Sequence, residues 1–244
     1  MKIAVCVKAV PDAAGGRRID PATQRLDRSG ELALSEFDAY AVEEALKLGG
    51  EVVIVSMGPE RALDALRKAL AMGADRAVLV SGDELAGSDL LGTAAALARA
   101  LEAESPDLVL FGQQSADGGG ACLWAAVAEH LKRPAISQVS ELTVSGDSLT
   151  GKRQTEFGYD TIRAPLPAVV AVSDAINTPR YPSLKGIMGA KKKPQETVSA
   201  TAVASGTEVL ALNPPASRGD SVKFEDDGSA AEKIVEFLAE KRLV

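Results

Sequence analysis

Short apolar segments alternate with amphipathic segments through the first half of the chain, and this alternation limits the folds that the chain can adopt. The amphipathic segments repeat apolar residues at three- and four-residue spacing, which is the period of one helix face. Parallel strands need crossover connections, and right-handed crossovers place helices on both faces of a sheet. The sequence therefore predicts an α/β fold with a doubly wound, mostly parallel sheet. The expected strands are 2–8, 51–56, 77–80 and 107–111, and the expected helices are 35–48, 59–72, 89–103 and 119–131.

The hydrophobic period changes in the second half of the chain. From Ile136 apolar and polar residues alternate, with turn signals at 145–147 and near Gly158. Alternation of this kind is typical of antiparallel strands, which we expect to extend the sheet. A continuous apolar run at 168–172 follows and fits a buried strand.

Some segments lie outside this pattern. The polar insertion at 13–34 is expected to form a two-stranded excursion. After Asn177 the sequence becomes rich in proline and glycine, so we expect the α/β core to end there. The last segment, 229–243, is amphipathic and is expected to be a helix that buries its apolar face against a partner. The expected organisation is a core over 1–176, a loop over 177–195 and a C-terminal arm over 196–244.

Composition and charge exclude several classes of function. The net charge of −7 argues against nucleic acid as the main partner, because duplex binding depends on Lys and Arg that neutralise phosphates. Apolar residues make up 46% of the chain and charged residues 25%, so we expect a globular protein without stable membrane insertion. Cys6 and Cys122 have the spacing of neither a metal site nor a disulfide framework, which favours a cytoplasmic location. The single histidine, His130, has no nucleophile or metal-ligand pattern around it, so no catalytic residue is predicted.

Ligands of open α/β sheets bind beyond the carboxyl ends of the strands, where the crossovers diverge. The segments 8–12, 57–59 and 113–120 follow expected strands and should meet at this edge, together with the helix start at Ser35. The glycine run 118–120 before a helix lets backbone amides approach an anion with no Cβ in the way. The sequence has neither a P-loop nor a GxGxxG fingerprint at these places. Because glycine runs are also ordinary turn material, a nucleotide site and a plain turn both remain open.

These segments stand in blocks that resemble the electron transfer flavoprotein beta-subunit family over nearly the whole chain. The blocks are VCVKAVPD, FDAYAVEEALKLG, VSMGPERALDALRKALAMGADRAV, DLVLFGQQSADGGG, LPAVVAV and NTPRYPSLKGIMGAKKKP. The resemblance implies a Rossmann-like fold similar to that of adenine-nucleotide hydrolases. It also implies an electron carrier subunit of a heterodimer, without substrate chemistry of its own. Such a carrier would pass electrons from acyl-CoA or other dehydrogenases, as in fatty acid oxidation, to a quinone oxidoreductase or another acceptor.

The resemblance further implies two cofactors and the residues that face them. FAD would be held mainly by the alpha subunit, on which the arm would pack, with Phe37 as a wall near the flavin. An AMP would be buried in the beta subunit. Leu184, with Arg180 and Tyr181 beside it, would anchor the dehydrogenase partner. The implied cofactor-binding positions are Cys6, Lys8, Ser35, Glu36, Phe37, Asp38, Met57, Ser115, Ala116, Asp117, Gly118, Gly119, Gly120, Ala121, Cys122 and Leu123.

The glycine segment departs from the family's pattern. The family carries polar residues where this chain has Ala121, Cys122, Leu123 and Trp124, so backbone amides alone would have to satisfy a phosphate there. Retention and loss of AMP therefore both stay open. Trp124 lies on an expected apolar helix face and is expected to pack in the core.

Other functions remain as alternatives to the simple carrier. One is the beta subunit of a flavin-bifurcating electron transfer flavoprotein, in which this site would hold a second FAD and NAD(H) would dock nearby. Another is a stand-alone nucleotide-binding sensor, against which the long, partly apolar arm argues. The basic run 191–193 could be an anion-binding patch, a docking surface or a solvated tail.

Overall fold

The computed structural model describes residues 1–12, 14, 16–213, 216 and 221–244 of the chain. These residues form two compact units, Met1–Val209 and Leu210–Val244, and each unit is described by itself. The first unit contains the sheet and the helices that cover it. The second unit contains helix α6 (Ala230–Glu240), which was expected over 229–243.

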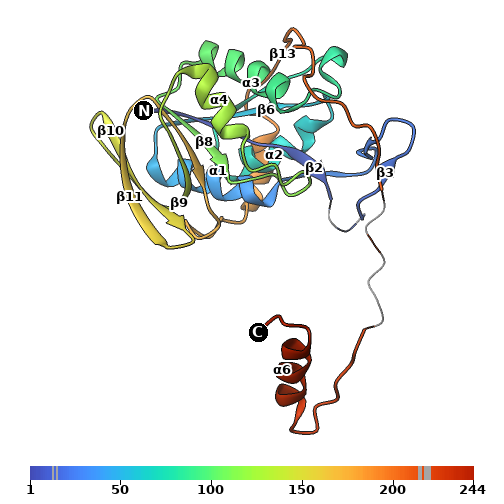
Figure 1. Cartoon of the computed structure of the whole chain (residues 1–244). Helices are drawn as coiled ribbons and strands as arrows, with labels where there is room; N and C mark the ends of the chain where they lie inside the picture. Colours follow the sequence, from blue (N-terminus) through green and yellow to red (C-terminus); the bar gives the residue numbers. More distant parts are fainter. Residues whose placement is uncertain (13, 15, 214–215, 217–220) are drawn as a thin grey trace. The chain divides into compact units, whose positions relative to one another are not determined.

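Nine strands of the first unit form one sheet (Figure 1). In spatial order they are β11 (Gly158–Pro165), β10 (Ser148–Thr155), β9 (Ala135–Ser145), β12 (Ala168–Val172), β8 (Leu108–Gly112), β1 (Lys2–Cys6), β6 (Glu51–Met57), β7 (Arg76–Val80) and β13 (Gln195–Val198). All neighbours from β9 to β13 pair in parallel, whereas β10 pairs antiparallel with both β9 and β11. The predicted doubly wound, mostly parallel sheet with an antiparallel extension is therefore confirmed.

Helices cover both faces of this sheet (Figure 1). Helices α1 (Glu36–Leu48) and α2 (Ala62–Met72) pack on one face, and α3 (Leu90–Glu104) and α4 (Leu123–Leu131) pack on the other. The alternation of side chains along a strand explains how β1 serves both faces. Ile3 and Val5 belong to the core cluster under α1 and α2, whereas Ala4 and Cys6 belong to the cluster under α3 and α4.

Two helix starts and an edge strand differ from the sequence prediction. Helix α2 begins at Ala62 rather than at residue 59. Helix α4 begins at Leu123 rather than at residue 119, because Gly119 and Ala121 have φ angles of 58° and 51°. A residue with such a φ lies in the left-handed region and cannot continue a right-handed helix. Strand β13 was not predicted. Its sequence, QETV, is polar, and the strand lies at an edge of the sheet where none of its residues is buried.

The segment between β1 and α1 contains two small antiparallel pairs. Strand β2 (Ala9–Pro11) pairs with β5 (Leu32–Leu34), and β3 (Ile19–Asp20) pairs with β4 (Arg25–Leu26). The β3–β4 hairpin is the excursion expected within residues 13–34, of which 13 and 15 lie outside the described residues. Short helices complete the first unit: the 3₁₀ helix η2 (Asp83–Leu85) and α5 (Leu184–Ala190), which packs against α2.

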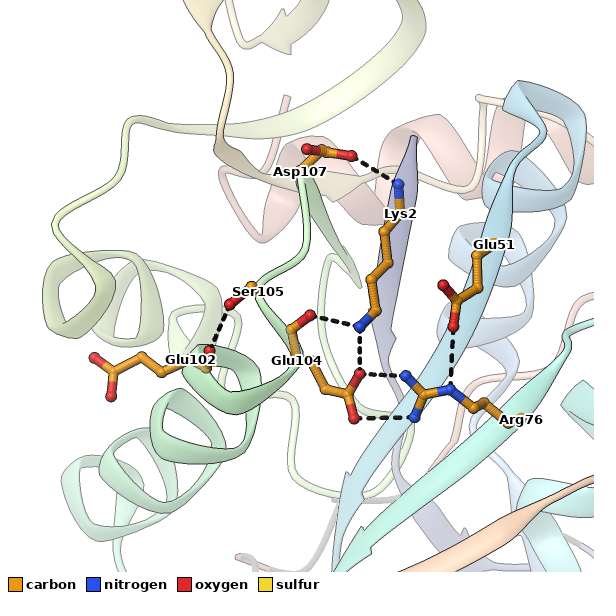
Figure 2. A network of polar contacts seen from close by, with 7 residues as sticks. All are labelled: Lys2, Glu51, Arg76, Glu102, Glu104, Ser105 and Asp107. Atoms are coloured by element: carbon orange, nitrogen blue, oxygen red, sulfur yellow. Dashed lines mark hydrogen bonds and ion pairs between the residues drawn. The ribbon is translucent and has the colours of Figure 1, made fainter.

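A network of charged side chains ties together the amino ends of the parallel strands (Figure 2). Arg76 donates hydrogen bonds to Glu104 Oε1 from Nη1 (2.9 Å) and to Glu51 Oε1 from Nε (3.1 Å). Lys2 Nζ lies 2.7 Å from Glu104 Oε2, and the backbone N of Lys2 donates to Asp107 Oδ2 (2.7 Å). The hydrogen bonds from Arg76 lower the pKa of Glu104 to about 2, although burial raises it. The network therefore holds β1, β6, β7 and the end of α3 together at the edge opposite the carboxyl ends.

Candidate functional site

The crossovers of the sheet diverge at β1. Strand β1 lies between β8 and β6; the chain reaches β6 through α1 and returns from β7 through α3 to β8, on the other side of β1. Ligands of open α/β sheets bind beyond the carboxyl ends of the strands at such a point. The structure brings Lys8, Ser35, Asp38 and residues 115–117 together there, and we call this group the carboxyl-end site.

Hydrogen bonds join the loops of the carboxyl-end site to one another. The backbone N of Lys8 donates to Asp38 Oδ2 (2.7 Å), and the backbone N of Ser35 donates to the carbonyl oxygen of Lys8 (3.0 Å). The backbone N of Ala116 donates to Ser35 Oγ (3.3 Å). Ser35 is the N-cap residue of α1, but its hydroxyl makes no hydrogen bond to the helix. The hydroxyl instead connects the start of α1 to the loop after β8.

Asp117 lies at the centre of the site and binds two cations. Lys8 Nζ lies 2.9 Å from Asp117 Oδ1, and Arg28 pairs with the other carboxylate oxygen. The side chain of Asp117 is 2% exposed. Burial raises the pKa of Asp117, but the hydrogen bonds and charges of Lys8 and Arg28 outweigh burial and hold it well below its usual range. Asp117 is therefore ionised at neutral pH and fixes two cations at the site.

Arg28 and Arg17 are site residues that the sequence did not identify. Both come from the excursion, and Arg17 donates a hydrogen bond to the carbonyl oxygen of Ala116. Arg28 also donates to the carbonyl oxygen of Ala9 (3.4 Å). The excursion from 18 to 28 lines a hollow of about 480 Å³, and Arg28 contributes to this hollow as well as to the ion pair with Asp117. No local pattern in the polar insertion distinguishes these two arginines from its other charged residues.

A second carboxylate, Asp38, is buried at the start of α1. Burial raises the pKa of Asp38 to about 7, against hydrogen bonds from the backbone and the charge of Lys8. Cys6 is also buried. Burial is the main cause that raises the pKa of its thiol, and the negative charge of the nearby Asp38 raises it as well. Gly112 closes this region from β8: a Cβ there would lie 2.6 Å from the backbone of Phe37 and 2.7 Å from Asp38 Oδ1. Only glycine therefore lets β8 approach α1 so closely.

The glycine loop itself is exposed. Residues 118–122 lie on the surface, and a Cβ on Gly120 would meet nothing within 4 Å. Trp124 donates from its indole N to the carbonyl oxygen of Ala121 (3.0 Å) and packs against the core cluster under α3 and α4, as expected. Met57 and Leu123 are partly buried against the same cluster.

The residues expected to bind a partner differ in exposure. Leu184 is 81% exposed and Tyr181 is 96% exposed, whereas the guanidinium of Arg180 is paired with Glu43. The adjacent acidic residues Glu43 and Glu44 have the sequence pattern of a solvated helix face, but that interpretation is wrong because both are buried. Lys193, in the basic run, is not part of a solvated tail: its Nζ donates to the carbonyl oxygens of Leu70 on α2 and of Ala74 just after it, and the run is thus partly structural.

The described residues contain neither a metal-binding cluster nor a membrane-spanning helix. No group of three or more His, Cys, Asp or Glu side chains within the described residues could hold a metal ion. Across the same part of the chain, no helix combines the length and the apolar character needed to cross a membrane.

Comparisons with known proteins agree with the fold. The family described as "Electron transfer flavoprotein domain" matches residues 23–203. An electron transfer flavoprotein subunit beta of Mycobacterium bovis is 37% identical over 99% of both chains. The subunit beta of Syntrophomonas wolfei is 36% identical over 98% of this chain and 96% of its own. The caffeyl-CoA reductase-Etf complex subunit CarD of Acetobacterium woodii is 35% identical over the whole of both chains. With a sheet of the expected topology and relatives matched from end to end, the chain belongs to the electron transfer flavoprotein beta-subunit family.

Proposed function

We propose that this chain is the electron carrier subunit beta of a heterodimeric electron transfer flavoprotein. The observation that carries the proposal is the similarity to named beta subunits along the entire chain. In this role the chain pairs with an alpha subunit and has no substrate chemistry of its own. The heterodimer takes electrons from acyl-CoA or other dehydrogenases and passes them to a quinone oxidoreductase or another acceptor. The proposed location is the cytoplasm, where free thiols such as Cys6 and Cys122 stay reduced.

FAD is the proposed redox cofactor, held between this chain and the alpha subunit. The bound flavin supplies the electron-transfer chemistry, and the protein supplies position and electrostatics. Phe37, partly exposed at the start of α1, is the proposed wall near the flavin. The close approach of Gly112 to the backbone of Phe37 supports this role, because it fixes the first turn of α1 against the end of β8.

AMP is the proposed ligand of the carboxyl-end site. The residues present fit an anion: the side chains of Lys8 and Arg28 remain 42% and 34% exposed although both pair with Asp117. In the glycine loop the amides of Gly118 and Gly119 donate to Ser115, which leaves the exposed backbone of Gly120 to add a donor without a Cβ in the way. Lys8 and Arg28 therefore have room to bind a phosphate that the apolar residues 121–123 cannot bind with their side chains. The remaining cofactor-binding positions, from Cys6 to Leu123, are proposed to line this ligand or the flavin.

The proposed organisation follows the same assembly. Residues 1–176 form the nucleotide-binding core, and residues 177–195 recognise the partner dehydrogenase. Residues 196–244 form the arm, of which the first three residues belong to β13 of the sheet and the second unit packs on the alpha subunit. The second unit supports the role of the arm, because none of the residues of α6 is buried within it. Ile234 and Val235 are 45% and 59% exposed, which leaves an apolar helix face available to a partner.

The experiment that tests the proposal measures cofactors in the assembled protein. The chain is co-expressed with the alpha subunit of the source organism, the complex is denatured, and the released FAD and AMP are quantified against protein. One FAD and one AMP per heterodimer are expected. Absence of flavin would overturn the proposal, and FAD without AMP would overturn the AMP assignment alone. Lys8→Met should lower the AMP content and leave the FAD content unchanged, because Lys8 is one of the residues that form the carboxyl-end site.

Two FAD per heterodimer would favour the second candidate function, a flavin-bifurcating beta subunit that also binds NAD(H). The observation in favour of this candidate is the 35% identity to the CarD subunit of a caffeyl-CoA reductase-Etf complex. Reduction of the flavins by NADH distinguishes this candidate from the simple carrier, which should not react with NADH.

A further inference from the structure

The segment that follows β12 is tied to α1 by charged and amide groups. We call residues 177–193 the docking segment. Asn177 donates from Nδ2 to the carbonyl oxygen of Tyr40 (3.1 Å) and to Glu44 Oε2 (3.0 Å). Three residues further on, Arg180 meets Glu43. Consecutive residues of α1, Glu43 and Glu44, thus hold the first residues of the docking segment, across a separation of more than a hundred residues in the chain.

The contact between Arg180 and Glu43 has the geometry of a specific clamp. Arg180 donates from Nε to Glu43 Oε2 (2.7 Å) and from Nη2 to Oε1 (2.8 Å), and its backbone N donates to Oε2 (3.1 Å). Bidentate pairs of this kind fix orientation as well as distance. Glu43 is buried, and burial raises its pKa, but the hydrogen bonds from Arg180 outweigh burial and lower it. Glu43 is therefore ionised at neutral pH and fixes both the side chain and the backbone of Arg180.

The other end of the docking segment is held by α2. The backbone of Gly186 passes so close to Ala71 that a Cβ would overlap the carbonyl oxygen. Lys193 Nζ donates to the carbonyl oxygens of Leu70 (3.0 Å), in the last turn of α2, and of Ala74 (2.5 Å), which follows the helix. Cations at a helix C-terminus satisfy carbonyl groups that lack helical partners. The backbone of the segment is thus anchored on two helices of the core.

Between these anchors the docking segment exposes large apolar side chains. Tyr181 is 96% exposed, Leu184 81%, Met188 75% and Ile187 51%. A held backbone with exposed apolar side chains is unfavourable in isolation, because the apolar surface stays in water. The same arrangement favours association, since a preorganised surface loses less conformational freedom when a partner covers it.

We infer that Glu43 is a positioning residue, which holds the apolar side chains of the docking segment in the arrangement that a partner dehydrogenase binds. The inference rests on the proposed function, because it assigns a role within docking by an electron transfer flavoprotein. Glu43 acts through Arg180 and does not contact the partner. Its carboxylate makes binding more favourable by ordering the segment before the partner arrives.

The test uses the heterodimer with its alpha subunit. Hydrogen exchange of the amides in 177–190 is followed by mass spectrometry in the wild type, Glu43→Gln and Arg180→Gln. The control is Asp64→Asn on α2, an exposed carboxylate that pairs with Arg67 rather than with a residue of the docking segment. We expect faster exchange in both variants of the clamp, unchanged exchange in the control and unchanged FAD content in all three.

The second readout is electron uptake from the dehydrogenase that reduces the wild-type heterodimer fastest, chosen from the acyl-CoA dehydrogenases of the source organism. The acyl-CoA substrate is oxidised and the heterodimer's FAD is reduced. Glu43→Gln should raise the KM for the heterodimer about threefold to tenfold, the factor expected when a few side chains must be ordered on binding, and should leave kcat unchanged. The double variant should match the single variants, because residues that act as one unit do not have additive effects.

Several results would overturn the inference. Unchanged exchange in Glu43→Gln would remove the positioning role, whatever the partner. Faster exchange with an unchanged KM would mean that the order of the segment does not serve docking. Additive effects of the two single variants on KM would mean that Glu43 does not act through Arg180. Failure of the proposed function gives a different result: no dehydrogenase would reduce the wild type, or Leu184→Ala would remove flavin rather than raise KM.

Discussion

Replacement of Glu104 by glutamine tests the charged network at the amino ends of the strands. Glu104 receives hydrogen bonds from Arg76 and pairs with Lys2, and its side chain is 13% exposed. The hydrogen bonds from Arg76 lower its pKa from 4.5 to about 2, although burial raises it. A shift of this size corresponds to about 3 kcal/mol. Arg76 is 25% exposed, and solvent screening there reduces the expected loss of stability to about 1–2 kcal/mol.

The same shift fixes the pH dependence of this loss. Because the pKa of Glu104 is lower in the folded chain than in the unfolded chain, its stabilisation is present above pH 4.5 and is lost as the pH falls toward 2. The free energy of unfolding, measured by urea titration, should therefore differ between wild type and Glu104→Gln at pH 7. The difference should shrink by about half between pH 5 and pH 3.

The matched control for this experiment is Glu129→Gln on α4. Glu129 also forms an ion pair, with Lys132 three residues further along the chain, but both side chains are largely exposed, at 77% and 76%. Exposed pairs contribute little to stability, so the unfolding curve of this variant should coincide with that of the wild type. Equal losses in the two variants, or a loss in Glu104→Gln that does not change with pH, would refute the reasoning.

Further predictions concern the carboxyl-end site and the docking segment. Gly112→Ala should lower the free energy of unfolding by about 1–3 kcal/mol, because its Cβ would lie 2.6 Å from the backbone of Phe37; Gly30→Ala, whose Cβ meets nothing within 4 Å, should leave it unchanged. In the wild type the free energy of unfolding should fall as the pH rises from 4 to 7, because burial raises the pKa of Asp38 to about 7 and the folded chain keeps a proton that the unfolded chain releases. Asp38→Asn should remove this fall. An equal pH dependence in both proteins would contradict this account. Gly186→Ala should speed hydrogen exchange in α5, because its Cβ would overlap α2, and an unchanged rate would show that the contact does not hold the helix.

Much of the fold could be predicted because it depends on local periodicity. Strands such as β1 and β8 are continuous apolar runs, and the helices between them repeat apolar residues on one face. The rule that ligands bind at the carboxyl ends then placed Lys8, Ser35 and Asp117 at one edge before their contacts were seen. Whether these residues bind a nucleotide stays a prediction, since periodicity and topology determine where a site lies and not what fills it.

The features that could not be predicted depend on contacts between distant parts of the chain. Glu43 and Glu44 look like a solvated helix face because their partners, Arg180 and Asn177, lie more than a hundred residues away. Arg28 reaches Asp117 from a polar insertion without a recognisable motif. The late start of α4 depends on the backbone angles of Gly119 and Ala121. A run of glycines in the sequence does not show at which residue the following helix begins. Residue patterns carry no information on such pairings.

The strand β1 separates the two polar regions of the first unit. It begins at Lys2, in the network of Figure 2, and ends at Cys6, beside the carboxyl-end site. Five residues of extended chain span about 13 Å. Mutational effects at sites farther apart than about 10 Å are usually additive. Stability can therefore be raised at the amino ends of the strands independently of the carboxyl-end site. A chain stabilised in this way is a background in which destabilising variants of Asp117 or Gly112 still fold, so that their ligand binding can be measured.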